Sequence, residues 1–258
     1  MPTFSVVTPS LDQGLFLGEC LASVRDAASR ANVEVQHIVM DGGSSDGTVE
    51  ILNNRPDVEW VSAPDRGQTD AINKGLALAR GEIVSYLCAD DLLEVDSLRL
   101  VGEAFSADEK IDVVYGDAFF LEAGWKRRKS AGEFSVSRLR RGNFLFQPAV
   151  FLRRRVVERF GSFQAKLRFC MDHEYWLRVC GDTAWHYIPE PLASSRLHPD
   201  AKTWKQLVPA WDEARRMQAV YGIYWRPLRD AWWMRIAGCH FYRIKRNMIA
   251  MMARRRSV

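Results

Sequence analysis

Short β-rich runs alternate with helix-compatible stretches through the first part of the chain. The β-rich runs lie at 4–8, 33–40, 58–63 and 82–87. Apolar residues at helical spacing occupy 15–28, a short helix-like segment follows at 49–52, and a further helix is predicted from Thr69, as its cap, to a stop at Gly81. This alternation predicts an α/β fold in which a mostly parallel sheet carries helices on both faces.

Polar side chains follow three of the predicted strands at the point where each strand ends. Thr8, Pro9 and Ser10 follow the first strand, Asp41 follows the second, and Asp90 with Asp91 follows the fourth. In a parallel sheet, ligands bind outside the carboxyl ends of the strands. We therefore expect these groups to line one crevice.

Each acid also has a structural explanation. Asp41 can stabilise its own glycine-rich turn, Asp46 can cap the helix that follows DGGSS, and Asp91 can cap a helix near Leu92. These explanations stay open for each residue taken singly. The convergence of the acids at one edge of the sheet favours a shared binding site.

The adjacent carboxylates at 90 and 91 repel each other, so a cation is the readiest way to keep both ionised. Mg²⁺ or Mn²⁺ prefers such oxygen ligands and in turn holds phosphate oxygens. The pair therefore indicates a nucleoside diphosphate site. The sequence contains neither GxxxxGK(S/T) nor GxGxxG, which argues against a P-loop NTPase and against a dinucleotide-dependent oxidoreductase.

The composition is typical of a soluble globular protein. The 258 residues, 47% hydrophobic and 26% charged, suffice for one large α/β domain or for such a domain with a C-terminal addition. Five widely spaced cysteines without a CxxC pair indicate neither a disulfide framework nor a zinc site, so we expect a reducing cytoplasm. No signal peptide or transmembrane run is visible in the sequence.

Basic charge is concentrated at the C-terminal end. Residues 225–258 contain nine Arg or Lys and one acid, whereas the whole chain carries only +4, so the remainder is net acidic. Trp, Phe and Met residues are interleaved with these cations, a mixture that suits an amphipathic helix on an anionic membrane surface. A solvated basic tail is the alternative. A nucleic-acid partner is not expected, because the rest of the chain supplies no matching basic face or recognised module.

Several motifs together resemble a known family. FSVVTPS, DGGSSDGT, PDRGQTDAINKG and ADD, in order over residues 3–95, look like the nucleotide-binding half of family 2 glycosyltransferases, and residues 143–179 are similar to the family's acceptor-side segment. The resemblance fades beyond Thr203. It implies a GT-A fold, Rossmann-like, over residues 1–203, with a nucleotide-sugar half at 1–95 and an acceptor half at 96–203. Residues 204–258 would then form a helical, basic, amphipathic C-terminal segment.

The resemblance also implies roles for the residues on the nucleotide side. Asp41 matches the family's aspartate that contacts the nucleobase, with Thr8 and Pro9 lining the same pocket. Asp70, in PDRGQTDAINKG, matches another acid near the nucleotide. These residues would together bind the donor.

Further roles concern the metal and the reaction. Asp90 and Asp91 match the family's DXD-type motif, Asp90 facing the ribose or metal and Asp91 ligating the metal that bridges the diphosphate. Asp172, in CMDHEYW, matches the catalytic base, although an N-cap would also explain it. His198, in SSRLHPDAKT, matches a position that reaches the metal or the diphosphate. Cys88 stands where many members have Asp or Asn, and we expect it to be a packing residue and not a ligand.

The resemblance therefore implies an inverting glycosyltransferase that uses Mn²⁺ or Mg²⁺. It would move a sugar from a nucleotide-diphosphate sugar, with UDP as the expected nucleotide, to a glycan or lipid-linked acceptor in cell-surface polysaccharide or glycolipid synthesis. We expect a cytoplasmic enzyme, held at the cytoplasmic face of a membrane if the basic tail binds there. Two other classes stay open: a nucleotidyltransferase, disfavoured because TPSLDQG has no cation after the first strand, and a non-catalytic sugar- or membrane-binding module on the same fold.

Overall fold

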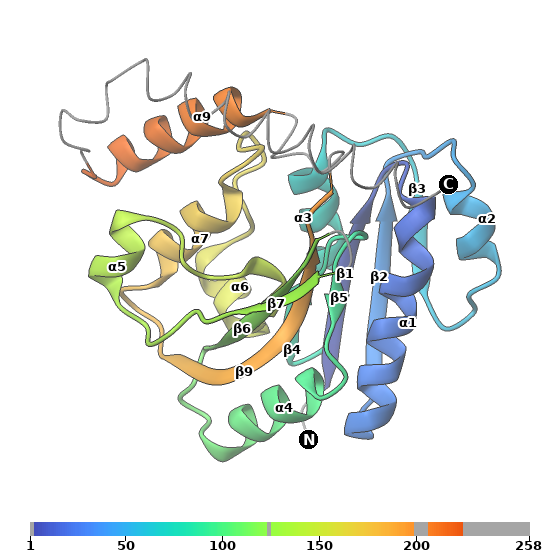
Figure 1. Ribbon diagram of the computed structural model, residues 1–258, viewed down its shortest axis with the longest axis horizontal. Helices are drawn as coiled ribbons and strands as arrows, with labels where there is room; N and C mark the ends of the chain where they lie inside the picture. Colours follow the sequence, from blue (N-terminus) through green and yellow to red (C-terminus); the bar gives the residue numbers. More distant parts are fainter. Residues whose placement is uncertain (1–2, 123–124, 199–205, 224–258) are drawn as a thin grey trace.

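The structure is a computed structural model that describes residues 3–122, 125–198 and 206–223. Figure 1 shows one curled sheet flanked by helices. The first half of the chain runs β1 (Phe4–Ser10), α1 (Gly14–Ala31), β2 (Val35–Asp41), α2 (Thr48–Asn53), β3 (Glu59–Ser62), α3 (Gln68–Leu78) and β4 (Ile83–Tyr86). The second half runs β5 (Leu92–Leu93), α4 (Ser97–Ala107), β6 (Val113–Glu122), β7 (Trp125–Lys129), α5 (Val136–Arg141), the 3-10 helix η1 (Gln147–Ala149), β8 (Val150–Arg153), α6 (Arg154–Phe160), α7 (Met171–Val179), β9 (Trp185–Arg196) and α9 (Leu207–Val220).

The first four strands form a parallel sheet in the order β3-β2-β1-β4. Successive residues of a strand point to opposite faces. Val6 accordingly lies in one core cluster with Cys20 and Val24 of α1, while Val7 lies in another with Ile72 of α3. Helices thus cover both faces of this sheet, and the predicted α/β architecture is confirmed.

The second half continues the sheet with mixed pairing. Strand β8 runs antiparallel to β4 and β6, β9 runs parallel to β6, and β5 pairs antiparallel with β9. The last of these pairs sets Leu92 opposite Ser194. Since β5 directly follows the two acids at 90 and 91, this pairing brings the end of β9 beside them.

The predicted cap at Thr69, the predicted helix stop at Gly81 and the possible cap at Asp91 are all wrong. Thr69 lies inside α3, which begins after Gly67, and its hydroxyl donates to the Leu167 carbonyl over 2.7 Å. The helix ends at Leu78, before Gly81, because the chain there passes against β1: a Cβ on Gly81 would lie 2.5 Å from the Phe4 carbonyl carbon. No helix follows Asp91 directly, since β5 intervenes and α4 begins at Ser97.

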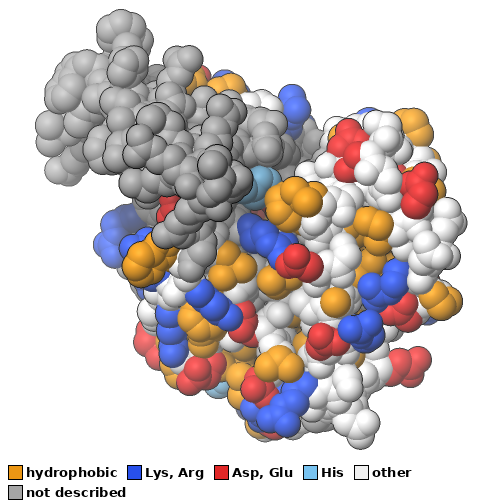
Figure 2. All heavy atoms as spheres, turned by 45° about the vertical axis from the view of Figure 1, so that its right-hand side comes forward, with side chains coloured by type: hydrophobic (Ala, Val, Ile, Leu, Met, Phe, Trp, Pro, Cys, Tyr) orange, Lys and Arg blue, Asp and Glu red, His pale blue; other side chains and the backbone are white. Residues whose placement is uncertain are grey.

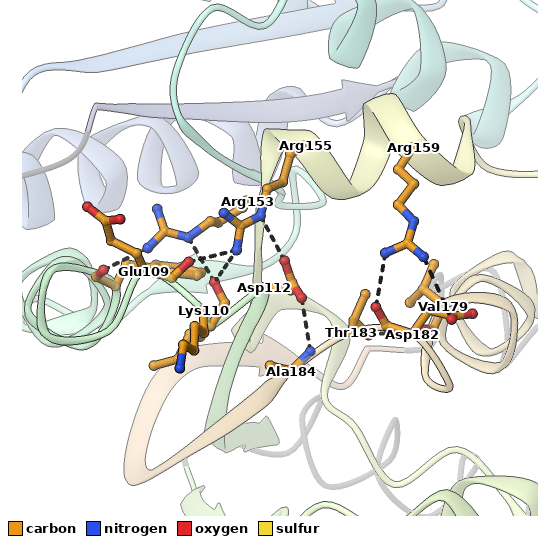
Figure 3. Close-up of polar contacts among 12 residues, drawn as sticks. Glu109, Lys110, Asp112, Arg153, Arg155, Arg159, Val179, Asp182, Thr183 and Ala184 are labelled. Atoms are coloured by element: carbon orange, nitrogen blue, oxygen red, sulfur yellow. Dashed lines mark hydrogen bonds and ion pairs between the residues drawn. The ribbon is translucent and has the colours of Figure 1, made fainter.

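Two arginines of α6 form hydrogen bonds near the amino end of β4, which is the end of the strand opposite the acid pair. Arg155 Nε donates to Asp112 Oδ1 over 2.9 Å, and Asp112 Oδ2 accepts the Ala184 N–H over 3.0 Å (Figure 3). Arg159 of α6 donates to the Asp182 carbonyl at the end of the α7 region over 3.3 Å. These bonds join α6 to the residues just before β6 and just before β9. They therefore stabilise the second half of the sheet at the end remote from the acid pair.

Helix α9 lies over α7 in Figure 1. Its Glu213 accepts hydrogen bonds from the backbone just before α7, and Tyr221 donates to Glu174 Oε1 of α7 over 2.7 Å. None of the described helices is long and apolar enough to cross a membrane. The basic stretch 225–258, for which membrane binding was expected, lies outside the described residues.

The described surface turned forward in Figure 2 carries cations, acids and apolar side chains interspersed. A nucleic-acid interface would instead present its Lys and Arg as a continuous patch or stripe. The described face in Figure 2 carries no such continuous patch, and the absence of a nucleic-acid partner stays a prediction.

Candidate active site

Two adjoining cavities open where β1 and β4 end. The Pro9 cavity, of about 340 Å³, is lined by the end of β1, the loop 65–69 and the residues around Ala165–Arg168. The Asp172 cavity, of about 290 Å³, is lined by Asp91, Asp172 and the end of β9. The two cavities share four residues: Gln68, Cys88, Asp90 and Arg168. A ligand that spans both would cross the acid pair.

Asp91 is the buried member of the acid pair. Asp91 is only 7% exposed. Burial and the neighbouring charge of Asp90 raise its pKa to about 8, although a hydrogen bond from Ser195 and the backbone N–H and charge of Arg196 act in the opposite direction. A cation bound beside Asp91 would favour the ionised form of its carboxylate.

A divalent cation fits this arrangement. One ligand atom each from Cys88, Asp90 and Asp91 lies within 4.8 Å of the other two. The two carboxylates are the oxygen ligands that Mg²⁺ and Mn²⁺ prefer. The Cys88 thiol is less suited, because burial and the two nearby acids raise its pKa well above its ordinary value, and it accepts a hydrogen bond from Gln68 Nε2 at 3.1 Å. Asp90 and Asp91 are thus the residues that would hold the cation, with the sulfur beside them.

His198 lies beside Asp90, and its expected contact with a metal or a diphosphate stays a prediction. Its Nε2 lies 3.0 Å from Asp90 Oδ2, and its ring packs on that of Phe16 with centroids 4.8 Å apart. His198 also lines the Pro9 cavity. The end of β9 contributes a second contact, since Arg196 Nη1 donates to the Asp90 carbonyl over 3.1 Å.

Asp172 lines the Asp172 cavity together with Tyr86, the last residue of β4. Helix α7 begins at Met171, so Asp172 occupies its first turn and is not the N-cap. Asn143 Nδ2 donates to Asp172 Oδ2 over 2.8 Å. Burial raises the pKa of Asp172, and the backbone N–H and charge of His173 together with the Asn143 bond offset part of that rise. A carboxylate with a raised pKa that faces a cavity is the kind of group that accepts a proton in catalysis.

Three residues assigned to the nucleotide side differ in where they point. Asp41 accepts hydrogen bonds from Gly43 N, Ser44 N and Ser62 Oγ, at 3.1, 3.0 and 2.6 Å, so it stabilises its own turn. These bonds keep its pKa below the ordinary value despite its burial. The fully buried Thr8 hydroxyl bonds to His37 Nε2 at 2.9 Å. Of Thr8, Pro9 and Asp41, only Pro9 lines either cavity; the nucleobase role of Asp41 stays a prediction.

Asp70 does not line the Pro9 cavity but forms an ion pair with Arg66, which does. Its carboxylate, 8% exposed, pairs with Arg66 Nη2 at 2.8 Å and with Lys74 Nζ at 2.9 Å. These bonds lower the pKa of Asp70 well below its ordinary value. Arg66 lines the Pro9 cavity and Asp70 does not, so the direct contact of Asp70 with a nucleotide stays a prediction.

The sequence analysis assigned no role to several residues of the site. Ser10 Oγ and Gln13 Oε1 are buried oxygens without a hydrogen-bond partner among the described residues, and both residues line the Pro9 cavity. Buried polar atoms are normally paired, so these oxygens are available to a ligand. Ser10 was expected at this edge of the sheet because it follows the first strand, although no specific role was assigned to it. Asn143 and Arg168 had no such signal, because only the fold brings them to the cavities.

Known proteins resemble the chain in sequence. A PGL/p-HBAD biosynthesis glycosyltransferase of Mycobacterium tuberculosis is 29% identical over 196 residues, which cover 71% of this chain and 72% of the relative. An uncharacterized glycosyltransferase of the same organism is 31% identical over 182 residues, 69% of each chain. Each similarity covers more than two thirds of this chain.

Solved structures resemble the chain in fold. Staphylococcus aureus TarS 1-349 in complex with UDP-GlcNAc superposes with a TM-score of 0.68 at 16% identity, over 83% of this chain and 65% of that one. The mannosyltransferase PcManGT from Pyrobaculum calidifontis, in complex with GDP-Man and Mn²⁺, gives a TM-score of 0.59 at 18% identity, over 98% and 85% of the two chains. This chain thus spans less than two thirds of the length of that TarS fragment, and the likeness shows the GT-A fold.

The sequence model of the family Glycosyl transferase family 2 matches residues 5–170. The match contains β1 to α6 and both acids of the pair, and it ends immediately before the helix that carries Asp172. It covers more than half of the chain, and the chain therefore belongs to glycosyl transferase family 2.

Proposed function

We propose that the protein transfers a sugar, with inversion, from a nucleotide-diphosphate sugar to a hydroxyl acceptor, with Asp172 as the general base. The observation that carries the proposal is that Asp91 and Asp172 line the same cavity, next to the Pro9 cavity. The acid pair would hold the diphosphate at the junction, while the base faces the acceptor. An inverting transfer needs the base and the leaving group on opposite sides of the reacting carbon.

In the proposed step the acceptor oxygen attacks the anomeric carbon and its proton passes to the Asp172 carboxylate. The bond between that carbon and the diphosphate oxygen breaks, and its electron pair leaves with the diphosphate. The raised pKa of Asp172, caused by burial, makes the carboxylate a stronger proton acceptor than an exposed one. Asn143 orients it through the 2.8 Å bond to Oδ2.

The donor is proposed to place its nucleotide in the Pro9 cavity and its diphosphate at Asp90 and Asp91. A bound Mn²⁺ or Mg²⁺ would neutralise the charge that develops on the diphosphate. TarS is described in complex with UDP-GlcNAc, and PcManGT in complex with GDP-Man and Mn²⁺. On this basis we propose a UDP-sugar as the donor, with a GDP-sugar as the alternative that the experiment resolves.

The acceptor is proposed to be a glycan or a lipid-linked glycan in cell-surface polysaccharide or glycolipid synthesis. The support is the relative that is described as a PGL/p-HBAD biosynthesis glycosyltransferase. The basic residues of 225–258 would hold the enzyme at the cytoplasmic face of an anionic membrane, where such an acceptor is found.

The experiment is a donor screen with the full chain. Hydrolysis and transfer are measured for UDP-, GDP- and dTDP-sugars with Mn²⁺, in the wild type, in Asp91→Ala and in Asp26→Asn, whose exposed carboxylate on α1 provides a charge-matched control. We expect turnover with one donor class, its loss in Asp91→Ala and its retention in Asp26→Asn. Absence of turnover with every donor, together with unchanged nucleotide binding in Asp91→Ala, would reject the transferase in favour of a non-catalytic module.

A further inference from the structure

Arg168 stands at the junction of the two cavities. It is the one cation among the four residues that line both. It is exposed, and among the described residues its guanidinium has no hydrogen bond or ion pair, unlike the other two arginines of the site. Arg66 is paired with Asp70, and Arg196 is paired with Glu19. Among the three arginines of the site, Arg168 is thus the one whose guanidinium forms no ion pair with a described residue.

The backbone at Arg168 is held by helix α9. Glu213, 9% exposed, accepts hydrogen bonds from the N–H groups of Arg168, Phe169 and Cys170 at 2.8, 2.7 and 3.0 Å. The Cys170 thiol donates to the same carboxylate over 3.3 Å. Three backbone donors on one buried carboxylate fix the segment that leads into α7. The match to the family ends at residue 170, so α9 lies beyond it.

We propose that Arg168 is a catalytic residue that donates hydrogen bonds to the departing diphosphate, and that Glu213 is the positioning residue that sets Arg168 at the junction. The inference rests on the proposed function. The bond that breaks must lie between the nucleotide in the Pro9 cavity and the base in the Asp172 cavity, which is where both cavities have Arg168 as a wall. A guanidinium presents paired N–H donors to phosphate oxygens. The hydrogen bonds from these donors strengthen as negative charge develops on the oxygens.

The ligands of the cluster formed by Cys88, Asp90 and Asp91 explain why a further positive charge is needed at the diphosphate. The third member of the cluster is the Cys88 sulfur, so the cluster offers two carboxylates to a cation. With fewer anionic ligands, a metal held there binds less firmly and neutralises less of the diphosphate charge. The Arg168 guanidinium, which lines both cavities, supplies a second positive charge that needs no ligand set.

The test compares Arg168→Gln with Lys166→Gln in the full chain. Lys166 is an exposed cation on the same loop, but it lines a separate cavity between α7 and α9. With the donor found in the screen, kcat of Arg168→Gln should fall on the order of 100-fold, as for loss of one donor to a developing oxyanion. Arg168→Lys should recover part of that loss, and Lys166→Gln should stay within about twofold of the wild type, since surface changes away from the site have small effects.

Glu213→Gln separates positioning from contact. In Glu213→Gln an NH₂ group replaces one carboxylate oxygen, so a hydrogen-bond donor faces the backbone N–H donors of 168–170. The amide hydrogens of these residues should then exchange faster, and kcat should fall. In Arg168→Gln, kcat should fall while those amides exchange as in the wild type. An Arg168→Gln variant with kcat within about threefold of an active wild type overturns the assignment of Arg168, and unchanged exchange in Glu213→Gln overturns that of Glu213. A wild type that transfers no sugar from any donor overturns the proposed function itself.

Discussion

The amide of Asn143 donates a hydrogen bond to Asp172 Oδ2 over 2.8 Å, although the two residues lie 29 positions apart. Asn143 follows α5, whereas Asp172 opens α7, and the packing of these two helices brings the pair together. The bond holds the carboxylate in one orientation toward the cavity and favours its ionised form. The proposed base is therefore tuned by a residue from another element.

Removal of this bond should shift the pH dependence of the reaction. Burial already raises the pKa of Asp172, and the Asn143 bond lowers it, so Asn143→Leu should raise that pKa further. A base works only when deprotonated, so activity is lost as the pH falls through the pKa of Asp172. We expect the acid limb of kcat/KM to move to higher pH in Asn143→Leu, with nucleotide binding unchanged. An acid limb of kcat/KM at the same pH in Asn143→Leu and in the wild type would show that Asp172 is not the group that titrates.

Cation binding should depend on the acids far more than on the sulfur. A ligating cysteine must be a thiolate. Burial and the two acids disfavour that form by raising the pKa of Cys88. We expect Cys88→Ser to keep Mn²⁺ affinity within about threefold and Asp91→Asn to lose at least about tenfold, as for damage to a metal site. Titration of free Mn²⁺ by electron paramagnetic resonance measures both, and equal losses in the two variants would show that the sulfur ligates.

The buried His37 should make the fold sensitive to acid. Burial, with a smaller effect of the Arg55 charge, lowers its pKa from 6.5 to about 3, so the native state keeps it neutral. The unfolded chain takes up the proton below pH 6.5, and stability therefore falls as the pH drops from there toward 3, by about 1.4 kcal/mol per pH unit.

His37→Gln removes this titration and should reduce the loss of unfolding free energy between pH 6.5 and 4.5 by about 2 to 3 kcal/mol. Denaturant titration at the two pH values measures the difference. The matched control is His186→Gln, which changes an exposed histidine of β9 and should leave the difference as in the wild type. The same pH difference in wild type and His37→Gln would contradict the account.

Two helical glycines should respond oppositely to alanine. A Cβ on Gly75 of α3 would lie 2.3 Å from Val7 Cγ1, so Gly75→Ala should destabilise the protein by about 1 to 3 kcal/mol through overpacking. A Cβ on Gly18 of α1 would meet no atom within 4 Å, so Gly18→Ala should stabilise it by about 0.5 to 1 kcal/mol. Thermal unfolding measures both, and a neutral Gly75→Ala would show that α3 shifts away from β1 at little cost.

Local patterns predicted the parallel half of the fold well, because short β-rich runs there alternate with helix-compatible stretches along the chain. The rule that ligands bind outside the carboxyl ends of parallel strands located Asp90, Asp91 and Pro9. Asp172 came only from the family resemblance. Asn143, Arg168 and Glu213 could not be found, since their roles depend on contacts made across the fold. The cap assigned to Thr69 failed for a related reason: the hydroxyl bonds to Leu167, which lies 98 residues further along the chain.

The most direct test of the central claim is the comparison of donor binding and sugar transfer in Asp172→Asn. Calorimetry with the donor and Mn²⁺ gives binding, and single-turnover transfer gives the chemical step. If Asp172 accepts the proton, binding should stay within about threefold while transfer falls on the order of 100-fold or more, the contribution of a positioned general base. Transfer at the wild-type rate in Asp172→Asn would contradict the account.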